Sequence, residues 1–321
     1  MIQKAEVKDL PIVAELACKL WPDNAVEGLR SEMGEILAKP DAAFYIAYVE
    51  DVPAGFAQCQ LRYDYVEGTD SSPVGYLEGI YVAEEYVDFN QGIDSRLITD
   101  ENMAKLAEIP IRPVRIAFDH WSLRKKYEEA VRIAVKHGHT NLSNYILYNF
   151  EDRPLELYWR LKLNVDLCEE LNASIYSFPM KYHPIEDPDY FSNRDYIGKH
   201  WNRKFIRTIQ AILNSTKGKV GKGHDFFCKA FGANEEEFYK LLYMPEAMII
   251  YRFYFEGIGM TEKWWNDFNS LNEEEMRIIK PIIEHNDFSD IGNQTDNANV
   301  LRVLQYYCIT REDAERAMAD N

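Results

Sequence analysis

The sequence predicts an α/β protein whose first 86 residues form a separate α+β segment. Three observations predict this class. Before Tyr86, a strand and two helices are followed by three consecutive strands; after Tyr86, strands alternate with helices; from Pro188 onward, the segments read as helices. Consecutive strands favour antiparallel pairing, whereas strands separated by helices imply a parallel sheet.

The front segment, residues 1–86, begins with a strand and two helices. IQKAEV alternates as a short strand does, and apolar residues recur at helical spacing in KDLPIVAELACKLW. WPDN interrupts this helix, AVEGLRSEMGEILA forms a second one, and KPD ends it. Three strands follow, separated by a short turn at 50–53 and by the polar loop EGTDSS: AAFYIAYVE, VPAGFAQCQLRYDYV and PVGYLEGIYV.

Residues 87–187 alternate strands with helices. The strand-like segments are FNQGIDSRL, RPVRIAFD, NLSNYILYNF and SIYSFPMKYHPI, and the helical segments between them are TDENMAKLAEI, SLRKKYEEAVRIAVKHG and PLELYWRLKLNVDLCEELN. Four strands and three helices amount to about half of an eightfold βα barrel. The sequence therefore predicts a partial barrel, followed by a helical region over residues 188–321.

The composition is typical of a globular protein. Of the 321 residues, 46% are hydrophobic and 28% are charged, and the chain has no apolar run of about 18 residues that could span a bilayer. Its start, MIQKAEVKDL, lacks the apolar core of a signal peptide. We therefore expect a cytoplasmic protein with no membrane partner.

The net charge of −17 is concentrated in the front segment. Its 86 residues hold 6 Lys and Arg against 16 Asp and Glu. Such a surface repels nucleic acid and attracts polycations, although acidic faces also serve solubility alone. We expect a polycationic small molecule as a possible partner, and no nucleic acid.

The five cysteines are isolated from one another. They are Cys18, Cys59, Cys168, Cys228 and Cys308, and no two have the C-x-x-C spacing of a metal or redox motif. Reduced, packed thiols are the expected state, and no metal site is predicted.

Three stretches of the front segment carry a resemblance to a known family. They are KLWPDN (19–24), GEILAKPDAAFYIAYVEDVPAGFAQCQLRYDYVEGTDSSPVGYLEGIYV (34–82) and the AEEY that follows. Together they resemble the GNAT acetyltransferases, and within them the aminoglycoside 6′-N-acetyltransferases. The resemblance implies a GNAT-like antiparallel sheet that is cut short, and transfer of an acetyl group from acetyl-CoA to an aminoglycoside amine.

The resemblance also implies site residues. The antibiotic site would be lined by Trp21, Tyr65, Asp70 and Glu78, and the backbone of Ile80 and Val82 would receive the pantetheine arm of acetyl-CoA. The chemistry agrees, because aminoglycosides carry several ammonium groups that carboxylates pair with and aromatic faces cover. Glu78 lies within the apolar strand GYLEGIYV, where a carboxylate needs a partner or a purpose. Trp21, taken without the resemblance, reads more simply as a core anchor.

The chain departs from the GNAT pattern directly after this strand. The family continues with a Q/R-x-x-G-x-G/A loop and a helix whose N-terminal amides bind the pyrophosphate of the cofactor. This chain has VDFNQGIDSRL instead, which lacks the second glycine and the basic residues before it. We therefore expect acetyl-CoA to bind poorly.

Residues 87–321 resemble the later part of a radical S-adenosylmethionine (SAM) enzyme. The stretches that carry this resemblance are DFNQGIDSRLIT, EIPIRPVRIAFDH, KHGHTNLSNYILYNFEDRPLELYWRLKLNVDLCEEL, IYSFPMKYHPI and YIGKHWNRKFIRTIQAILNSTKGKVGKGHDFFCKAFG. By position, the residues facing cofactor or substrate would be Gln91, Asp94, Arg96, Asp119, Asn144 and Asn149. Without the resemblance, most of these read as strand-end caps or turn residues.

The second resemblance also lacks its cofactor motif. A 4Fe–4S cluster needs three thiolates, typically in C-x-x-x-C-x-x-C, and no such trio occurs in the chain. Three hypotheses therefore remain: a catalytically inactive radical SAM-like protein with a foreign leading segment, an aminoglycoside acetyltransferase-like protein without its pyrophosphate loop, or a non-functional fusion joined near Tyr86. In each case neither acetyl-CoA nor SAM with its cluster is expected to bind well.

Overall fold

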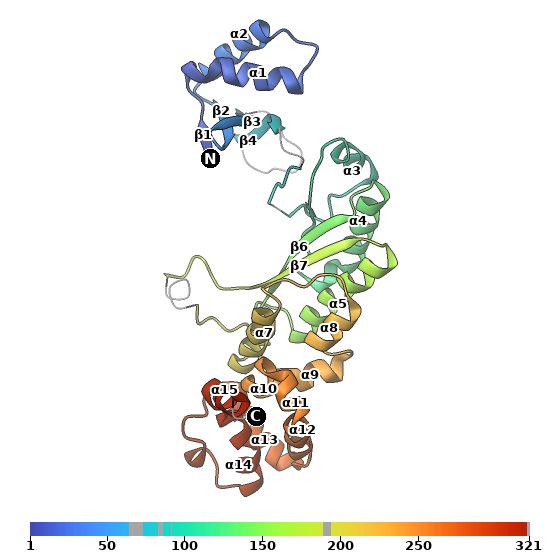
Figure 1. Cartoon of the computed structure of the whole chain (residues 1–321), viewed down its shortest axis with the longest axis vertical. Helices are drawn as coiled ribbons and strands as arrows, with labels where there is room; N and C mark the ends of the chain where they lie inside the picture. The colour runs from blue at the N-terminus through green and yellow to red at the C-terminus, as the bar shows by residue number, and fades with distance from the viewer. Residues whose placement is uncertain (64–72, 83–85, 91, 189–193, 320–321) are drawn as a thin grey trace. The chain divides into compact units, whose positions relative to one another are not determined.

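The computed structural model describes residues 1–63, 73–82, 86–90, 92–188 and 194–319. The chain divides into two compact units, Met1–Val87 and Asp88–Asn321, which are described here one at a time (Figure 1).

The first unit is built on a four-stranded antiparallel sheet in the order β1-β2-β3-β4. The strands are β1 (Ile2–Lys4), β2 (Ala42–Val49), β3 (Val52–Arg62) and β4 (Val74–Val82). Glu50 and Asp51 join β2 to β3 in a two-residue turn with φ of 49° and 64°. Positive φ at both central residues is the geometry that matches the twist of paired strands, so this turn fixes the hairpin.

Helices α1 (Leu10–Leu20) and α2 (Val26–Leu37) supply the core of the first unit, after a short 3₁₀ turn η1 (Val7–Asp9). The buried side chains recur at helical spacing on α1 and at alternate positions on the strands. They include Val13, Ala14, Leu16 and Ala17 from α1, Leu29 and Met33 from α2, and Phe44, Ile46 and Phe56 from the sheet. The GNAT-like antiparallel sheet with its helices is thus present.

The second unit opens with a three-stranded parallel sheet in the order β5-β6-β7. Its strands are β5 (Val114–Arg115), β6 (Asn141–Tyr148) and β7 (Ser174–Lys181), and they alternate with helices α3 (Asp100–Leu106), α4 (Arg124–Lys136) and α5 (Pro154–Glu170) and the 3₁₀ turn η2 (Trp121–Leu123). The core between strands and helices includes Val114, Leu142, Ile175, Tyr127 and Leu167.

The predicted half barrel is not shown, because no strand is assigned to the described residues of its first segment, FNQGIDSRL. Among those residues Ile93 forms an isolated parallel bridge to Ile116. The chain then turns, since the Arg96 amide donates to the Asp94 carboxylate (2.9 Å) and the Leu97 amide to the Asp94 carbonyl (3.0 Å). This local turn competes with the strand and ends it after one bridge.

The outer edge of β7 is partly covered by the turn around Val220. The Ser177 amide donates to the Val220 carbonyl (2.7 Å) and the Val220 amide to the Ser177 carbonyl (2.8 Å). This antiparallel bridge satisfies backbone groups that an edge strand would otherwise expose.

The rest of the second unit is helical, as the sequence predicts. The elements are α7 (Arg203–Ser215), α8 (His224–Phe231), α9 (Glu235–Tyr243), α10 (Glu246–Ile250), α11 (Arg252–Gly257), α12 (Met260–Asn269), α13 (Glu273–His285), η3 (Ile291–Asn293), α14 (Ala298–Leu304), η4 (Gln305–Cys308) and α15 (Arg311–Ala319). They share one apolar core that includes Ile209, Phe238, Trp264, Ile279 and Val303. In the described ranges, no helix combines the length and the apolar character that crossing a bilayer requires.

Candidate functional site

Glu78 occupies a β-bulge in the middle of β4. The register pairs Gln58 with Gly79 and Cys59 with Leu77, so Glu78 is the extra residue between them. A bulge bends its strand and re-aims a side chain that regular alternation would place elsewhere. In this strand the bulge lets a carboxylate stand at the sheet surface with only 24% of its side chain exposed.

Arg62 at the end of β3 forms a two-point ion pair with this carboxylate. Its Nε lies 3.1 Å from Glu78 Oε1 and its Nη2 lies 3.3 Å from Glu78 Oε2. The same guanidinium lies over the ring of Tyr76, 4.0 Å from its centroid. The carboxylate that the resemblance assigns to a cationic substrate is therefore already neutralised by a cation of this chain.

Trp21, at the end of α1, packs against the same region of the sheet. Its ring lies 6.1 Å from that of Phe56 in a tilted arrangement. A Cβ atom built on Gly79 would lie 2.9 Å from Cη2 of Trp21, so only glycine leaves room for the indole beside the bulge. Trp21 is half-buried and thus combines a packing role with a partly open ring face.

Of the other four residues predicted for the first unit, two lie in β4 and two lie outside the described part of the chain. Tyr65 and Asp70 lie outside the described residues. Ile80 and Val82 pair with Ala57 and Gly55 of β3, and the other edge of β4 has no strand partner within the described part of the unit. The structure thus places Trp21 against Gly79, the residue that follows Glu78, in the strand that also carries Ile80 and Val82.

Residues 88–97, which follow β4 in the chain, belong to the second unit. Asp88 pairs with Arg115 of β5, with 2.7 Å between Oδ2 and Nη2, and the hydroxyl of Tyr145 donates to Asn90 Oδ1 at 3.2 Å. A Cβ atom on Gly92 would lie 3.3 Å from that of Ala117. A pyrophosphate loop and helix would have to occupy this stretch, but its side chains are held by the parallel sheet instead.

The candidate residues of the second unit fall into four groups, three of which are described first. Asp94 and Arg96 pair with each other at the surface, and the hydrogen bonds from Arg96 hold the pKa of Asp94 below its usual range. Asp119 is exposed, yet partial desolvation raises the pKa of its carboxyl group against the opposing effect of the Arg160 charge. Gln91 lies outside the described residues.

Asn144 and Asn149 are bound to buried protein groups. Asn149 has φ of 69°; its amide donates to the carbonyls of Tyr182 (3.1 Å) and Tyr196 (3.0 Å), and its Oδ1 accepts from the Gly198 amide (2.9 Å). Asn144 donates to the hydroxyl of Tyr127 at 2.5 Å, while its own Oδ1 is buried without a hydrogen-bond partner. These contacts fix the loop after β6 and the packing of α4, and they give the two asparagines a structural role.

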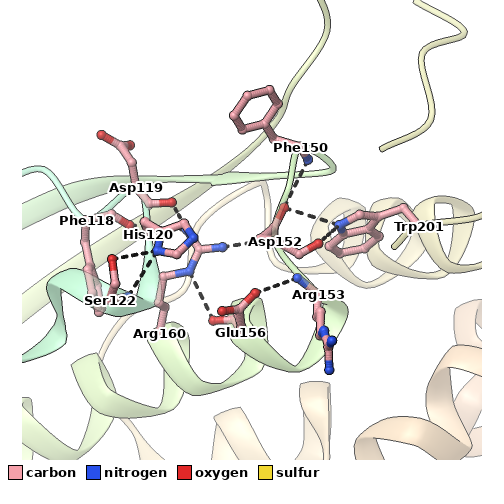
Figure 2. A network of polar contacts seen from close by, with 10 residues as sticks. All are labelled: Phe118, Asp119, His120, Ser122, Phe150, Asp152, Arg153, Glu156, Arg160 and Trp201. Carbon is pink, nitrogen blue, oxygen red and sulfur yellow. Dashed lines mark hydrogen bonds and ion pairs between the residues drawn. The ribbon is translucent and has the colours of Figure 1, made fainter. Parts of the chain in front are cut away.

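A buried charge network that the sequence did not predict lies at the ends of β5 and β6 (Figure 2). Arg160 of α5 is fully buried and donates to the carbonyls of Phe118 (3.3 Å) and Asp119 (2.8 Å) and to the carboxylate of Asp152 (3.1 Å). Trp201 donates to the Asp152 carbonyl at 2.9 Å. The signal in the sequence is an arginine among the apolar residues of PLELYWRLKL, which requires a buried partner.

The described residues contain no group of three His, Cys, Asp or Glu side chains arranged to hold a metal ion.

Comparisons with known proteins connect the front of the chain to one family. The sequence profile of the "Acetyltransferase (GNAT) family" matches residues 11–100. An "Aminoglycoside N(6')-acetyltransferase type 1" from Serratia marcescens is 48% identical over 84 residues, which are 26% of this chain and 56% of that protein. A protein of the same name from Stenotrophomonas maltophilia is 41% identical over 86 residues, 26% of this chain and 55% of that protein.

One solved structure is the aminoglycoside antibiotic 6'-N-acetyltransferase of Acinetobacter haemolyticus in its apo form. It is 23% identical, and the alignment covers 45% of this chain and 77% of that chain with a TM-score of 0.25, too low to carry an argument. Nothing in these comparisons supports the resemblance of residues 87–321 to radical SAM enzymes.

The profile match runs to residue 100, whereas the structure places residues 88–100 in the second unit. Asp88, Asn90 and Ile93 contact the parallel sheet, so the last part of the profile match, residues 88–100, lies outside the antiparallel sheet. The chain spans about half the length of the curated relatives that it matches. Its N-terminal part therefore resembles the GNAT aminoglycoside 6'-N-acetyltransferases up to the end of β4, the last strand of its antiparallel sheet.

Proposed function

We propose that the first unit binds an aminoglycoside, as the acceptor-side part of a GNAT-type acetyltransferase. The observation that carries the proposal is the 48% identity over 84 residues to a protein named for this activity, combined with a carboxylate placed in a bulge of β4. The acidic front segment adds a long-range attraction for a polycation.

Arg62 indicates how the ligand would be held. The Glu78 carboxylate accepts two hydrogen bonds from the guanidinium, and Tyr76 lies against the face of that cation. A cationic ammonium group of an aminoglycoside could take the same place, between a carboxylate and an aromatic ring. In this proposal Arg62 is a stand-in for the ligand and moves aside when the ligand binds.

The residues present do not fit the cofactor of the family. A pyrophosphate is bound in such proteins by backbone amides at a helix N-terminus. Asp88, an acidic residue, and Asn90 lie where that loop would begin. Both belong to the second unit and contact its parallel sheet. We therefore propose binding of the acceptor without efficient acetyl transfer, and derive no catalytic step through acetyl-CoA.

Two measurements test this function separately. Titration calorimetry with kanamycin at low and high salt tests binding, which should weaken with salt because exposed charges are screened over about 8 Å at physiological ionic strength. Thiol release from acetyl-CoA with and without kanamycin tests transfer, and we expect no increase caused by the drug. Heat that does not depend on kanamycin concentration would remove the binding proposal, and drug-dependent thiol release would show that a cofactor site exists after all.

A further inference from the structure

The helices after β7 enclose a cavity of about 550 Å³ that the proposed function does not use. Side chains from α7 to α12 line it, and much of its wall is apolar, including Leu241, Met244 and Ile249. Two further lining residues, Phe226 and Phe253, are 49% and 85% exposed, so the cavity is reached from the surface. A cavity of this size with a few polar groups is typical of small-molecule sites.

Arg252 on the cavity wall has only a long ion pair with a carboxylate among the described residues. Two other arginines with little side-chain exposure each have a close carboxylate: Arg160 lies 3.1 Å from Asp152, and Arg115 lies 2.7 Å from Asp88. The side chain of Arg252 is 19% exposed, yet its nearest carboxylate, that of Glu256, is 3.9 Å from its Nε. Burial lowers the pKa of this guanidinium, which still carries its charge at neutral pH.

Two polar atoms of the cavity residues lack hydrogen-bond partners. Arg252 donates through Nη1 to the carbonyl of Lys229, but its Nη2 is covered and unpaired. Thr261 is 5% exposed and its hydroxyl is likewise buried without a partner. An unpaired buried donor is unfavourable, and an acceptor bound at this wall would satisfy both donors once their side chains turn toward the cavity.

The other four charges at the cavity balance one another, so its single net positive charge is that of Arg252. Lys229 and Lys240 line it together with Arg252, against the two carboxylates of Glu237 and Glu256. One of these carboxylates is engaged, because Glu237 Oε2 accepts from the Ala233 amide at 2.8 Å. The local surplus of positive charge contrasts with the net charge of −17 of the whole chain.

We propose that this cavity binds a small amphiphilic carboxylate. The apolar chain of the ligand lies against Phe226, Phe253 and Ile249, and its carboxylate accepts hydrogen bonds from the Arg252 guanidinium and the Thr261 hydroxyl. A planar carboxylate matches the two-pronged geometry of a guanidinium, which is why arginine is favoured for such ligands.

Cys228 provides a direct readout, since it lines the cavity and is half-buried. Octanoate and 1-octanol serve as probes that share an apolar chain and differ in charge. On the full-length protein, octanoate should slow alkylation of Cys228 by iodoacetamide, measured by peptide mass spectrometry, and leave the exposed Cys308 unchanged. The neutral alcohol should need roughly tenfold higher concentration, because hydrogen bonds between charged groups are stronger than those to a neutral hydroxyl.

Variants then locate the anion. Arg252→Met should reduce the protection by octanoate to the level of 1-octanol, whereas Arg277→Met, at an arginine that is 80% exposed on α13, should change nothing. If Arg252→Met fails to fold, the comparison of the two probes on the unsubstituted protein still decides. Equal protection by acid and alcohol, or no protection of Cys228 by either, would overturn the proposal.

Discussion

Arg62 and Glu78 hold each other at two points, with 3.1 Å between Nε and Oε1 and 3.3 Å between Nη2 and Oε2. The pair joins the end of β3 to the bulge in β4. Since the Arg62 side chain is 39% exposed, the pair contributes little to stability, about 0–1 kcal/mol. In the proposed function the pair has a larger effect on binding, because it would keep the carboxylate from the ammonium groups of an aminoglycoside.

The first prediction is that Arg62→Gln strengthens the binding of kanamycin. The substitution removes the competing cation and leaves Glu78 to accept from an ammonium group. We expect the dissociation constant to fall several-fold at low salt, measured by titration calorimetry. Lys39→Gln, which makes the same charge change at an exposed residue after α2, is the control and should have a much smaller effect. Weaker binding by Arg62→Gln would contradict this prediction, because it would show that Arg62 contacts the ligand instead of competing with it for Glu78.

The second prediction concerns Gly79 and Trp21. A Cβ at Gly79 would lie 2.9 Å from the indole, so Gly79→Ala should destabilise the first unit by about 1–3 kcal/mol through overpacking. Gly75→Ala is the matched control in the same strand, because a Cβ there meets nothing within 4 Å. Amide hydrogen exchange of peptides from α1 and β4 checks this result. Equal protection in the two variants would show that the indole moves away without cost.

The third prediction concerns the buried pair of Asp152 and Arg160. Their side chains are 5% and 0% exposed, so Asp152→Asn leaves a buried cation without its counter-charge and should cost about 3–5 kcal/mol. Glu170→Gln breaks the exposed surface pair with Arg132 and should change stability far less, because solvent screens exposed ion pairs. Urea unfolding followed by tryptophan fluorescence reports the second unit, which contains five of the six tryptophans. Similar midpoints for the two variants would contradict this expectation.

The fourth prediction is a pH dependence caused by Lys204. This fully buried amine donates to Thr208 Oγ1 (2.8 Å) and to the Met244 carbonyl (2.5 Å), and burial lowers its pKa to about 7. Between about pH 7 and 10.5 the unfolded chain binds the proton and the folded chain does not, so stability rises with pH. The slope should approach about 1.4 kcal/mol per pH unit from this group alone.

Lys204→Met should remove that part of the slope, because methionine fills the same space without a titratable group. The measurement is the free energy of unfolding in urea at pH 7, 8 and 9 for both proteins. Exposed Lys125 on α4, changed to Met, is the control that should keep the slope. Parallel pH profiles for Lys204→Met and the unsubstituted protein would show that the amine stays protonated in the folded state.

Much of the first unit could be predicted because its signals are local. Helical spacing in residues 10–20 and strand alternation around the Glu50 turn each depend on neighbours in the chain. The bulge at Glu78 could not be predicted by the same route, because an extra residue interrupts the alternation on which the prediction depends. Its position follows only from the register of β4 against β3.

The second unit shows more clearly what sequence patterns fail to predict. FNQGIDSRL has a strand-like composition, but the Arg96 amide donates a hydrogen bond to the Asp94 carboxylate, and the chain turns there. Arg160 is visible in the sequence as a charge in an apolar helix, yet its partners at Phe118 and Asp119 are about 40 residues away and are backbone carbonyls. Composition carries no information about a backbone acceptor, so the network emerges only from the fold.

In the proposed function, Glu78 receives an ammonium group of an aminoglycoside. Kanamycin binding to three forms of the protein tests this role. Kanamycin is titrated into the unsubstituted protein, Glu78→Gln and Glu15→Gln, the last an equal change of charge at an exposed residue of α1. We predict that Glu78→Gln weakens binding about tenfold or more, as expected for the loss of a charged hydrogen-bond acceptor, and that Glu15→Gln has little effect. Equal weakening by both variants would contradict the claim, since it would show that kanamycin responds only to the net charge of the unit.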